Sequence, residues 1–145
     1  MKLSRAVEQA CCIVVLLAHP ELRTPVTNNS LAERMKVSPT YITKITRKLV
    51  EKGLISSVRG TGGGFRLVRD RDEITLWDMV VAIEGEGNFV EYQGVAERMF
   101  PSEDSDEIDR GAGIIVRAFD RAYQNWAREL KEVTLKDIMK EIQHG

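Results

Sequence analysis

Cysteine, proline and long apolar runs are scarce in this chain of 145 residues, and each scarcity excludes a class of protein. The two cysteines, Cys11 and Cys12, are adjacent and cannot form the disulfide framework of a small secreted domain. The longest apolar run covers residues 10–18, whereas a membrane-spanning helix needs about 20 apolar residues. No small-residue cleavage site follows this run, so we expect no signal peptide and no membrane partner. With 4 prolines and 43% hydrophobic residues, the composition is typical of a folded, soluble, helix-rich protein.

Histidine is equally scarce, which argues against most catalytic sites. His19 and His144 are far apart in the sequence and form no metal-ligand pattern. No Ser/His/Asp or Cys/His set can be assembled, and no acidic pair marks the wall of a cleft. We therefore expect a protein that is not an enzyme.

The net charge of −1 conceals a strong asymmetry along the chain. Residues 1–71 contain 13 Lys/Arg and 5 Asp/Glu, whereas residues 72–145 contain 8 and 17. A basic first half suggests binding to a polyanion such as DNA. Chance clustering of surface charges is the alternative, and the positions of the basic residues decide between the two.

Two helices separated by a tight turn follow a first, nearly all-apolar helix that we expect over residues 5–18. Ser30 and Glu33 have the spacing of a capping box, which predicts a helix beginning at Ser30. Ser38 and Pro39 predict the N-cap and first residue of the next helix, which ends before a glycine. This spacing is typical of a helix-turn-helix motif.

The second helix of this motif has an apolar face and a polar face. Ile42, Ile45 and Leu49 recur at helical spacing and predict a buried stripe. At about 100° per residue, the opposite face carries hydroxyl and basic groups, which suit phosphates and base edges. An ordinary solvated face is the alternative, but its place after a short helix and a tight turn favours DNA recognition. With the N-cap and the flanking residues, the predicted contacts with double-stranded DNA are Ser38, Thr40, Tyr41, Thr43, Lys44, Arg47 and Lys48.

A predicted β-hairpin follows directly. Residues 54–58 and 65–68 alternate as β-strands do, and the glycine-rich residues 60–64 join them. A hairpin after a recognition helix is a wing, whose glycines let the backbone approach phosphates or a minor groove that attracts arginine. A nucleotide-binding loop does not fit, because Phe65 takes the last glycine position of the dinucleotide pattern and no Gly-Lys-Ser/Thr sequence follows. The predicted wing contacts with DNA are Arg59, Thr61, Gly62, Gly63 and Arg66.

The second half of the chain predicts a dimerisation helix. A fourth helix, capped by Thr75 and Asp78, is expected to end at Gly85. From Ile108, apolar residues recur at spacings of four and three, which is the pattern of a coiled-coil seam. A helix of about 25 residues overhangs a small domain, so we expect a dimer seam rather than packing on the chain's own core. The predicted dimer contacts are Ile115, Phe119, Ala122, Trp126 and Leu130.

These features predict a mainly α fold with a small β-hairpin wing (α+β). The expected organisation is a winged helix-turn-helix DNA-binding domain over residues 1–85, an acidic linker or loop over 86–107, and a helical dimerisation region over 108–145. The last region is expected to end in a short helix capped by Thr134 and Asp137.

Several segments carry a family resemblance. They are MKLS at the start, LAER at 31–34, YI at 41–42, LVEKGLI at 49–55, SVRGTGGGFRL at 57–67, EITLWD at 73–78 and AIEG at 82–85. Together they resemble the Rrf2 (IscR/NsrR-like) family of bacterial winged-helix regulators. The resemblance implies a cytoplasmic, homodimeric transcription regulator, usually a repressor, in which long helices associate and two winged helices read a pseudo-palindromic operator.

The sequence departs from the best-known members of that family, which hold an iron–sulfur cluster on three cysteines between the fourth and the long helix. Residues 86–111 contain neither cysteine nor histidine, and acidic residues such as Glu91 and Asp104 are poor ligands for such a cluster. We therefore expect a member without this cluster and with no cofactor.

Three alternatives stay open at this stage. Cys11 and Cys12 could sense redox state through a disulfide between subunits, or they could be small apolar residues of a buried helix. The winged helix could bind a protein, although its exposed face lacks apolar anchors. A small-molecule effector could bind among the first, fourth and long helices beside Trp77, Tyr92 and Trp126, unless these aromatics belong to the core.

Overall fold

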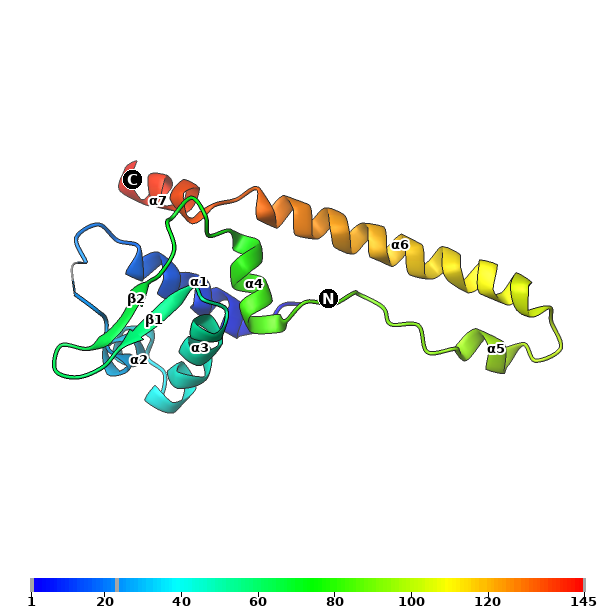
Figure 1. Ribbon diagram of the computed structural model, residues 1–145, viewed down its shortest axis with the longest axis horizontal. Coiled ribbons are helices and arrows are strands. Elements are labelled where there is room, and N and C mark those ends of the chain that lie inside the picture. The colour runs from blue at the N-terminus through cyan, green and yellow to red at the C-terminus, as the bar shows by residue number, and fades with distance from the viewer. Residues whose placement is uncertain (1, 23, 145) are drawn as a thin grey trace. The chain divides into compact units, whose positions relative to one another are not determined.

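A computed structural model describes residues 2–22 and 24–144, and the chain divides into two units. Unit 1 comprises the residues up to 85 and those from 130 onward, and unit 2 comprises residues 86–129. The elements of unit 1 are α1 (Arg5–Leu17), α2 (Asn28–Met35), α3 (Pro39–Glu51), β1 (Ile55–Val58), β2 (Gly64–Leu67), α4 (Leu76–Glu84) and α7 (Leu135–His144) (Figure 1). Unit 2 contains α5 (Val95–Met99) and nearly all of α6 (Ser105–Lys131). The fold is mainly helical with one antiparallel hairpin, as predicted.

The core of unit 1 forms where the apolar stripes of α1, α3 and α4 meet. Ile13 of α1, Ile42 and Leu49 of α3, and Met79 of α4 are fully buried. Burying a side chain of this size stabilises the fold by roughly 1.5–3 kcal/mol. The apolar stripe predicted for α3 is therefore confirmed, and its burial fixes which face of α3 is turned outward.

Local capping residues start several of these helices. Ser38 caps α3 as predicted, because its hydroxyl accepts a hydrogen bond from the Tyr41 N–H at 3.2 Å and Pro39 is the first helical residue. The predicted capping box at Ser30 is wrong. Thr27 caps α2 instead, and its hydroxyl accepts the Ser30 N–H at 3.1 Å. The helix starts earlier because Val26 is held in an extended bridge to Phe65, which leaves Thr27 as the first residue free to turn.

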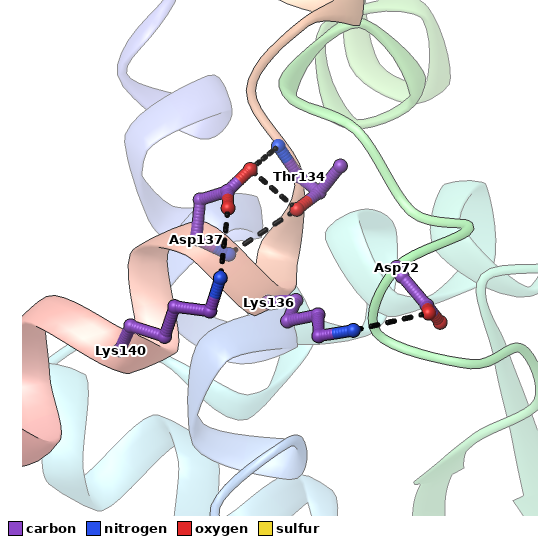
Figure 2. Close-up of polar contacts among 5 residues, drawn as sticks. All are labelled: Asp72, Thr134, Lys136, Asp137 and Lys140. Atoms are coloured by element: carbon purple, nitrogen blue, oxygen red, sulfur yellow. Dashed lines mark hydrogen bonds and ion pairs between the residues drawn. The ribbon is translucent and has the colours of Figure 1, made fainter.

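The sequence Thr-Leu-x-Asp occurs twice, at 75–78 and 134–137, and each copy starts a helix as predicted. In the second copy, the Thr134 N–H donates to Asp137 Oδ2 at 3.1 Å and the Asp137 N–H donates to Thr134 Oγ1 at 3.2 Å (Figure 2). The same figure shows Lys140 beside Asp137, at 3.6 Å, and Lys136 paired with Asp72, at 3.3 Å. The hydrogen bonds from Thr134 hold the pKa of Asp137 below its usual value.

The two copies also bind each other through an antiparallel bridge between Thr75 and Thr134. The Leu76 N–H donates to the Val133 carbonyl at 2.9 Å, and the Leu135 N–H donates to the Ile74 carbonyl at 2.8 Å. Residues 74–78 and 133–137 are called the threonine clasp below. The clasp joins segments that are nearly sixty residues apart in sequence, and it anchors α7 to unit 1.

Unit 2 is more ordered than the predicted acidic linker. The short helix α5 lies within residues 86–107, which were predicted to be irregular. α6 begins at Ser105 rather than Ile108, because Asp104 Oδ1 accepts the N–H groups of the first turn at 2.9 and 3.2 Å. Aromatic rings of Phe89, Tyr123 and Trp126 form a cluster with centroids 5.2–5.8 Å apart.

The C-terminal part of the chain is divided between the units, whereas the sequence predicted one helical region over 108–145. Leu135 and Met139 of α7 are buried in unit 1, where α7 contacts α1. The first part of the apolar face of α7 is thus buried within the protomer, while Ile142 near its end is 50% exposed. Within residues 2–22 and 24–144, none of the helices combines the length and the hydrophobicity that crossing a membrane would require.

Candidate nucleic-acid interface

The outward face of α3 presents four of the predicted DNA contacts. Thr40, Thr43, Lys44 and Arg47 are exposed, opposite the buried stripe. In the part of the chain that the structure describes, neither the Thr40 side chain nor the Lys44 side chain has a hydrogen-bond or ion-pair partner. A hydroxyl and an ammonium one helical turn apart therefore face solvent without an intramolecular role.

Arg47 and Thr43 make local contacts that a ligand can replace or share. The Arg47 Nε donates to Glu51 at 2.9 Å, with side-chain exposures of 78% and 60%. An exposed pair four residues apart is worth only about 0.3–0.5 kcal/mol, so a phosphate can compete for the guanidinium. The Thr43 hydroxyl donates to the Pro39 carbonyl at 2.9 Å, and its oxygen can still accept a hydrogen bond.

Three other predicted contacts on α3 have roles inside the protein. The Ser38 hydroxyl caps α3. The Tyr41 hydroxyl donates to Gln9 Oε1 of α1 at 2.8 Å, and the Lys48 Nζ donates to the Ile83 carbonyl of α4 at 2.8 Å. The last two partners are 32 and 35 residues away and leave no local pattern in the sequence from which they could be predicted. These contacts narrow the set of side chains available to read bases.

A hydrogen bond between α2 and α3 was also not predicted from the sequence. The Asn28 side-chain N–H donates to the Pro39 carbonyl at 2.9 Å, which links the first residue of α2 to the first residue of α3. Lys36 adopts the left-handed conformation, with φ 53°, and ends α2. These two features fix the turn of the motif, and therefore the angle at which α3 leaves it.

The hairpin carries the predicted wing residues on an exposed edge and tip. β1 pairs with β2 in an antiparallel register that places Arg66 opposite Ser56. Arg66 is exposed on β2, while Arg59 and Thr61 are exposed in the connecting turn. Reciprocal hydrogen bonds between Val26 and Phe65, at 3.0 and 2.8 Å, tie the wing to the segment before α2.

Packing explains two of the wing glycines. A Cβ on Gly63 would lie 2.3 Å from the Val58 carbonyl oxygen, across the end of the hairpin. A Cβ on Gly64, which has φ +143°, would lie 2.5 Å from the backbone carbonyl of Val26. Gly63 is therefore required for the hairpin to close, and Gly64 is required for the segment at Val26 to approach the hairpin. The presence of both glycines needs no bound nucleotide.

The two cysteines of α1 have different environments. Cys12 is exposed, whereas Cys11 is half-buried, and this burial raises the pKa of Cys11 to about 11, with smaller contributions from Cys12 and Glu8. Because the thiolate is the reactive form, Cys11 behaves as the small apolar residue considered above. Cys12 stays chemically accessible.

The side chains of residues 86–111 do not fit the iron–sulfur cluster that the best-known members of the resembled family hold there. Such a cluster needs several thiolate or imidazole ligands, and residues 86–111 supply none. Over the described residues, no three or more His, Cys, Asp or Glu side chains are grouped so as to hold a metal ion. The two free thiols, Cys11 and Cys12, lie in unit 1 on α1. They are consecutive residues of one helix and are not arranged around a common centre, as the ligands of a cluster would be.

The predicted dimer contacts on α6 fall into two groups. Ile115 and Phe119 are 59% and 44% exposed, and Ala122 is exposed beside them. Trp126 and Leu130 are instead half-buried, and Trp126 belongs to the ring cluster of unit 2. Among the predicted dimer contacts, those left exposed therefore lie in the middle of α6, over a shorter stretch than the predicted seam.

Unit 2 also contains an apolar cavity of about 530 Å³. Its lining comes from the segment 90–100 and from the first half of α6, and it includes Tyr92, Met99, Phe100, Ile108 and Ile115. Of the aromatics proposed to line an effector pocket, Tyr92 lines this cavity, while Trp77 is buried in unit 1 and Trp126 lies in the ring cluster. Because Ile108 and Ile115 also belong to the predicted seam, this cavity is continuous with it.

Comparisons with known proteins agree on one family. The family model of Rrf2, described as an iron-dependent transcriptional regulator, matches residues 3–141. The chain is 38% identical to YffB of Lactococcus lactis, over all of this chain and 91% of that protein, and 30% identical to YwgB of Bacillus subtilis, over 98% and 86%. The names of both assign them to the HTH-type transcriptional regulators. The fold of this chain is similar to that of CymR, the global cysteine regulator of B. subtilis. The TM-score is 0.66 at 24% identity, over 97% of this chain and 98% of that chain.

Proposed function

We infer the function from one premise: this chain belongs to the Rrf2 family of transcriptional regulators, which are not enzymes. We propose that it acts in the cytoplasm as a homodimer that binds a pseudo-palindromic operator and represses transcription. α3 would enter the major groove and the wing would follow the adjacent minor groove or its phosphates. Two winged helices related by a twofold axis would read the two half-sites.

The observation that carries this proposal is the outward face of α3. Thr40 and Lys44 are exposed and have no described partner, and Arg47 has only a weak surface pair. A basic and hydroxyl-bearing face without large apolar anchors suits phosphates and base edges better than a protein surface. The excess of basic residues before residue 72 adds a favourable electrostatic field for DNA.

The dimer is supported by the apolar surface of α6. Ile115, Phe119 and Ala122 lie on one side of a long helix and are left uncovered in the protomer. Exposed apolar residues on one helix face are typical of a subunit interface. The net charge of α6 favours an antiparallel pairing. Residues 105–110 contain three carboxylates and Arg110, whereas residues 120–131 contain Arg121, Arg128 and Lys131 against Asp120 and Glu129.

We propose that regulation does not use an iron–sulfur cluster held by residues 86–111. The chemistry of the side chains there supports this, since hard carboxylates replace the thiolates that a cluster needs. Purified protein expressed with iron and sulfide is expected to show no absorption bands near 320–420 nm that track with protein. A stoichiometric cluster retained by the Cys11→Ser, Cys12→Ser double variant would overturn this part of the proposal.

The main test is fluorescence anisotropy of the protein on duplex DNA from upstream of its own gene, with scrambled duplex as control. We expect selective binding that weakens steeply with salt, because counterions are released from the phosphates. Lys44→Ala should weaken binding to both duplexes, and Arg59→Ala should weaken it through the wing. Binding to neither duplex at low salt would overturn the DNA-binding proposal, and unchanged binding of Arg59→Ala would overturn the role of the wing.

A further arm adds a thiol oxidant to the same titration. Loss of selective binding in the parent but not in Cys12→Ser would make exposed Cys12 a redox sensor. Indifference to the oxidant would direct the search to an effector of another kind.

A further inference from the structure

Lys48 lies on the recognition helix and is exposed overall, but its ammonium makes a part-buried hydrogen bond to a neighbouring helix. Its Nζ donates to the carbonyl of Ile83 at 2.8 Å, from α3 to the last turn of α4. The final carbonyls of a helix have no intrahelical partner, and a cation there also interacts favourably with the helix dipole. Lys48 therefore caps the C-terminal end of α4 from a neighbouring helix.

The same turn of α4 also receives the segment before α1. The Ser4 N–H donates to Glu84 Oε1 at 2.8 Å, and this contact, with the nearby charge of Lys48, holds the pKa of Glu84 below its usual value. Gly85 then ends α4 at a positive φ of 83°, and unit 2 begins at the next residue. Three elements of unit 1 thus meet at the point where the chain leaves it.

We propose that Lys48 is a positioning residue for DNA recognition rather than a phosphate contact. Its bond to the Ile83 carbonyl holds α3 at the angle at which Thr40, Lys44 and Arg47 meet the groove. A displacement of residues 83–85, where unit 2 is attached, would remove the acceptor and loosen this restraint on α3, while the buried stripe of α3 stays packed. The inference rests on the proposed DNA-binding function.

The test compares Lys48→Met with Lys44→Met, two neutral replacements one turn apart on the same helix. Binding to operator and to scrambled duplex is measured by anisotropy between about 50 and 250 mM salt. Each lost phosphate contact reduces the slope of log K against log salt by about 0.9, doubled in a homodimer. Lys44→Met should show this reduction and weaken both duplexes. Lys48→Met should keep the parental slope and scrambled-duplex affinity but lose operator affinity by about tenfold.

Lys48→Gln, which keeps an N–H donor without the charge, supplies the rescue. Lys48→Gln should recover part of the operator affinity at an unchanged salt slope. If circular dichroism shows that Lys48→Met is unfolded, Lys48→Gln alone tests whether residue 48 positions α3 or contacts a phosphate. A reduced salt slope in either Lys48 variant, or unchanged operator affinity in Lys48→Met, would overturn the positioning role. Failure of the parent protein to prefer operator over scrambled duplex would instead overturn the proposed function itself, so the two failures are distinguishable.

Discussion

The two units differ in how far their apolar side chains are exposed to solvent. In unit 1, the aliphatic residues of α1, α3 and α4 pack on one another, and side chains such as Ile13, Ile42 and Leu49 are almost completely inaccessible. In unit 2, among the residues described, only Tyr123 and Ala127 are buried, while Met99, Ile114 and Ile115 are 68%, 65% and 59% exposed. The first unit is closed by its own contacts, and the second presents an apolar surface that a single copy leaves open.

This difference assigns different tasks to the two units. A closed core holds the recognition helix and the wing at fixed positions, which DNA reading requires. An open apolar surface is costly in water unless a partner covers it. Stability should therefore depend on unit 1, and assembly should depend on unit 2.

The largest effect is expected from a cavity in the core of unit 1. Leu49→Ala removes a fully buried side chain of α3 and should lower the free energy of unfolding by about 2–5 kcal/mol. Gln124→Ala on α6 is the control, because Gln124 is an exposed polar residue outside the apolar surface, and it should change this free energy by less than about 0.5 kcal/mol. Urea unfolding followed by circular dichroism measures both. Equal losses in the two variants would remove the contrast between the units.

The next effect tests assembly. Phe119→Glu places a charge in the middle of the proposed dimer surface, while Gln124→Glu places the same charge on the opposite side of α6. Sedimentation should show monomers for the first and dimers for the second. Operator affinity should fall by roughly 100-fold or more with Phe119→Glu, because two half-sites are no longer bound together. A Phe119→Glu protein that still forms dimers would show that this surface serves another purpose.

A smaller effect concerns the closure of unit 1 by α7. The pKa of Asp137 is lowered because the Thr134 hydroxyl and N–H donate to its carboxylate, so the charged form favours the folded state. This stabilisation is complete above the usual carboxyl pKa near 3.8 and is lost as the pH falls through the lowered value. Asp137→Asn should therefore lower the Tm at pH 7, with a difference from the parent that shrinks toward pH 3.

The control for this variant is Glu141→Gln, an exposed carboxylate on the same helix. Thermal unfolding at pH 7, 4 and 3 separates the two, since only the clasp residue should show a difference from the parent that shrinks at the lowest pH. A pH-independent loss in Asp137→Asn would mean that its carboxylate does not act through the bonds from Thr134.

The smallest effect is chemical. Cys11 faces the packed side of α1 and Cys12 faces solvent, so iodoacetamide at pH 8 should label Cys12 well before Cys11. In Cys12→Ser, labelling of Cys11 should still become fast only at strongly alkaline pH, because burial, the main cause of its raised pKa, remains. Peptide mass spectrometry measures the rates. Equal labelling of the two thiols at pH 8 would show that α1 is less enclosed than the structure indicates.

Features encoded by neighbouring residues could be predicted from the sequence. Ser38 with Pro39, and Thr75 with Asp78, start helices through contacts three residues apart, and the buried stripe of α3 follows from helical spacing. The prediction that Ser30 caps α2 was wrong because Thr27 offers a similar hydroxyl three residues earlier. Only the bridge between Val26 and Phe65, which the sequence does not reveal, selects Thr27.

Contacts between distant residues could not be predicted in this way. No local pattern reveals that Lys48 binds the carbonyl of Ile83 or that Tyr41 binds Gln9. The helix α5 is only a little longer than one turn, too short for an apolar period to become visible. The candidate DNA-binding face was thus found from periodicity, while the contacts that orient it required the structure.

The threonine clasp makes residues 86–129 an insertion between two parts of one folded body. The chain leaves unit 1 after residue 85 and returns at residue 130, where the clasp and the buried residues Leu135 and Met139 hold it by non-covalent contacts. A single proteolytic cut within the insertion would therefore leave two fragments that stay together as a complex. A chain shortened to residue 129 would instead lose one half of a paired structure, and the DNA-reading fragment would have to be built from both sides of the insertion.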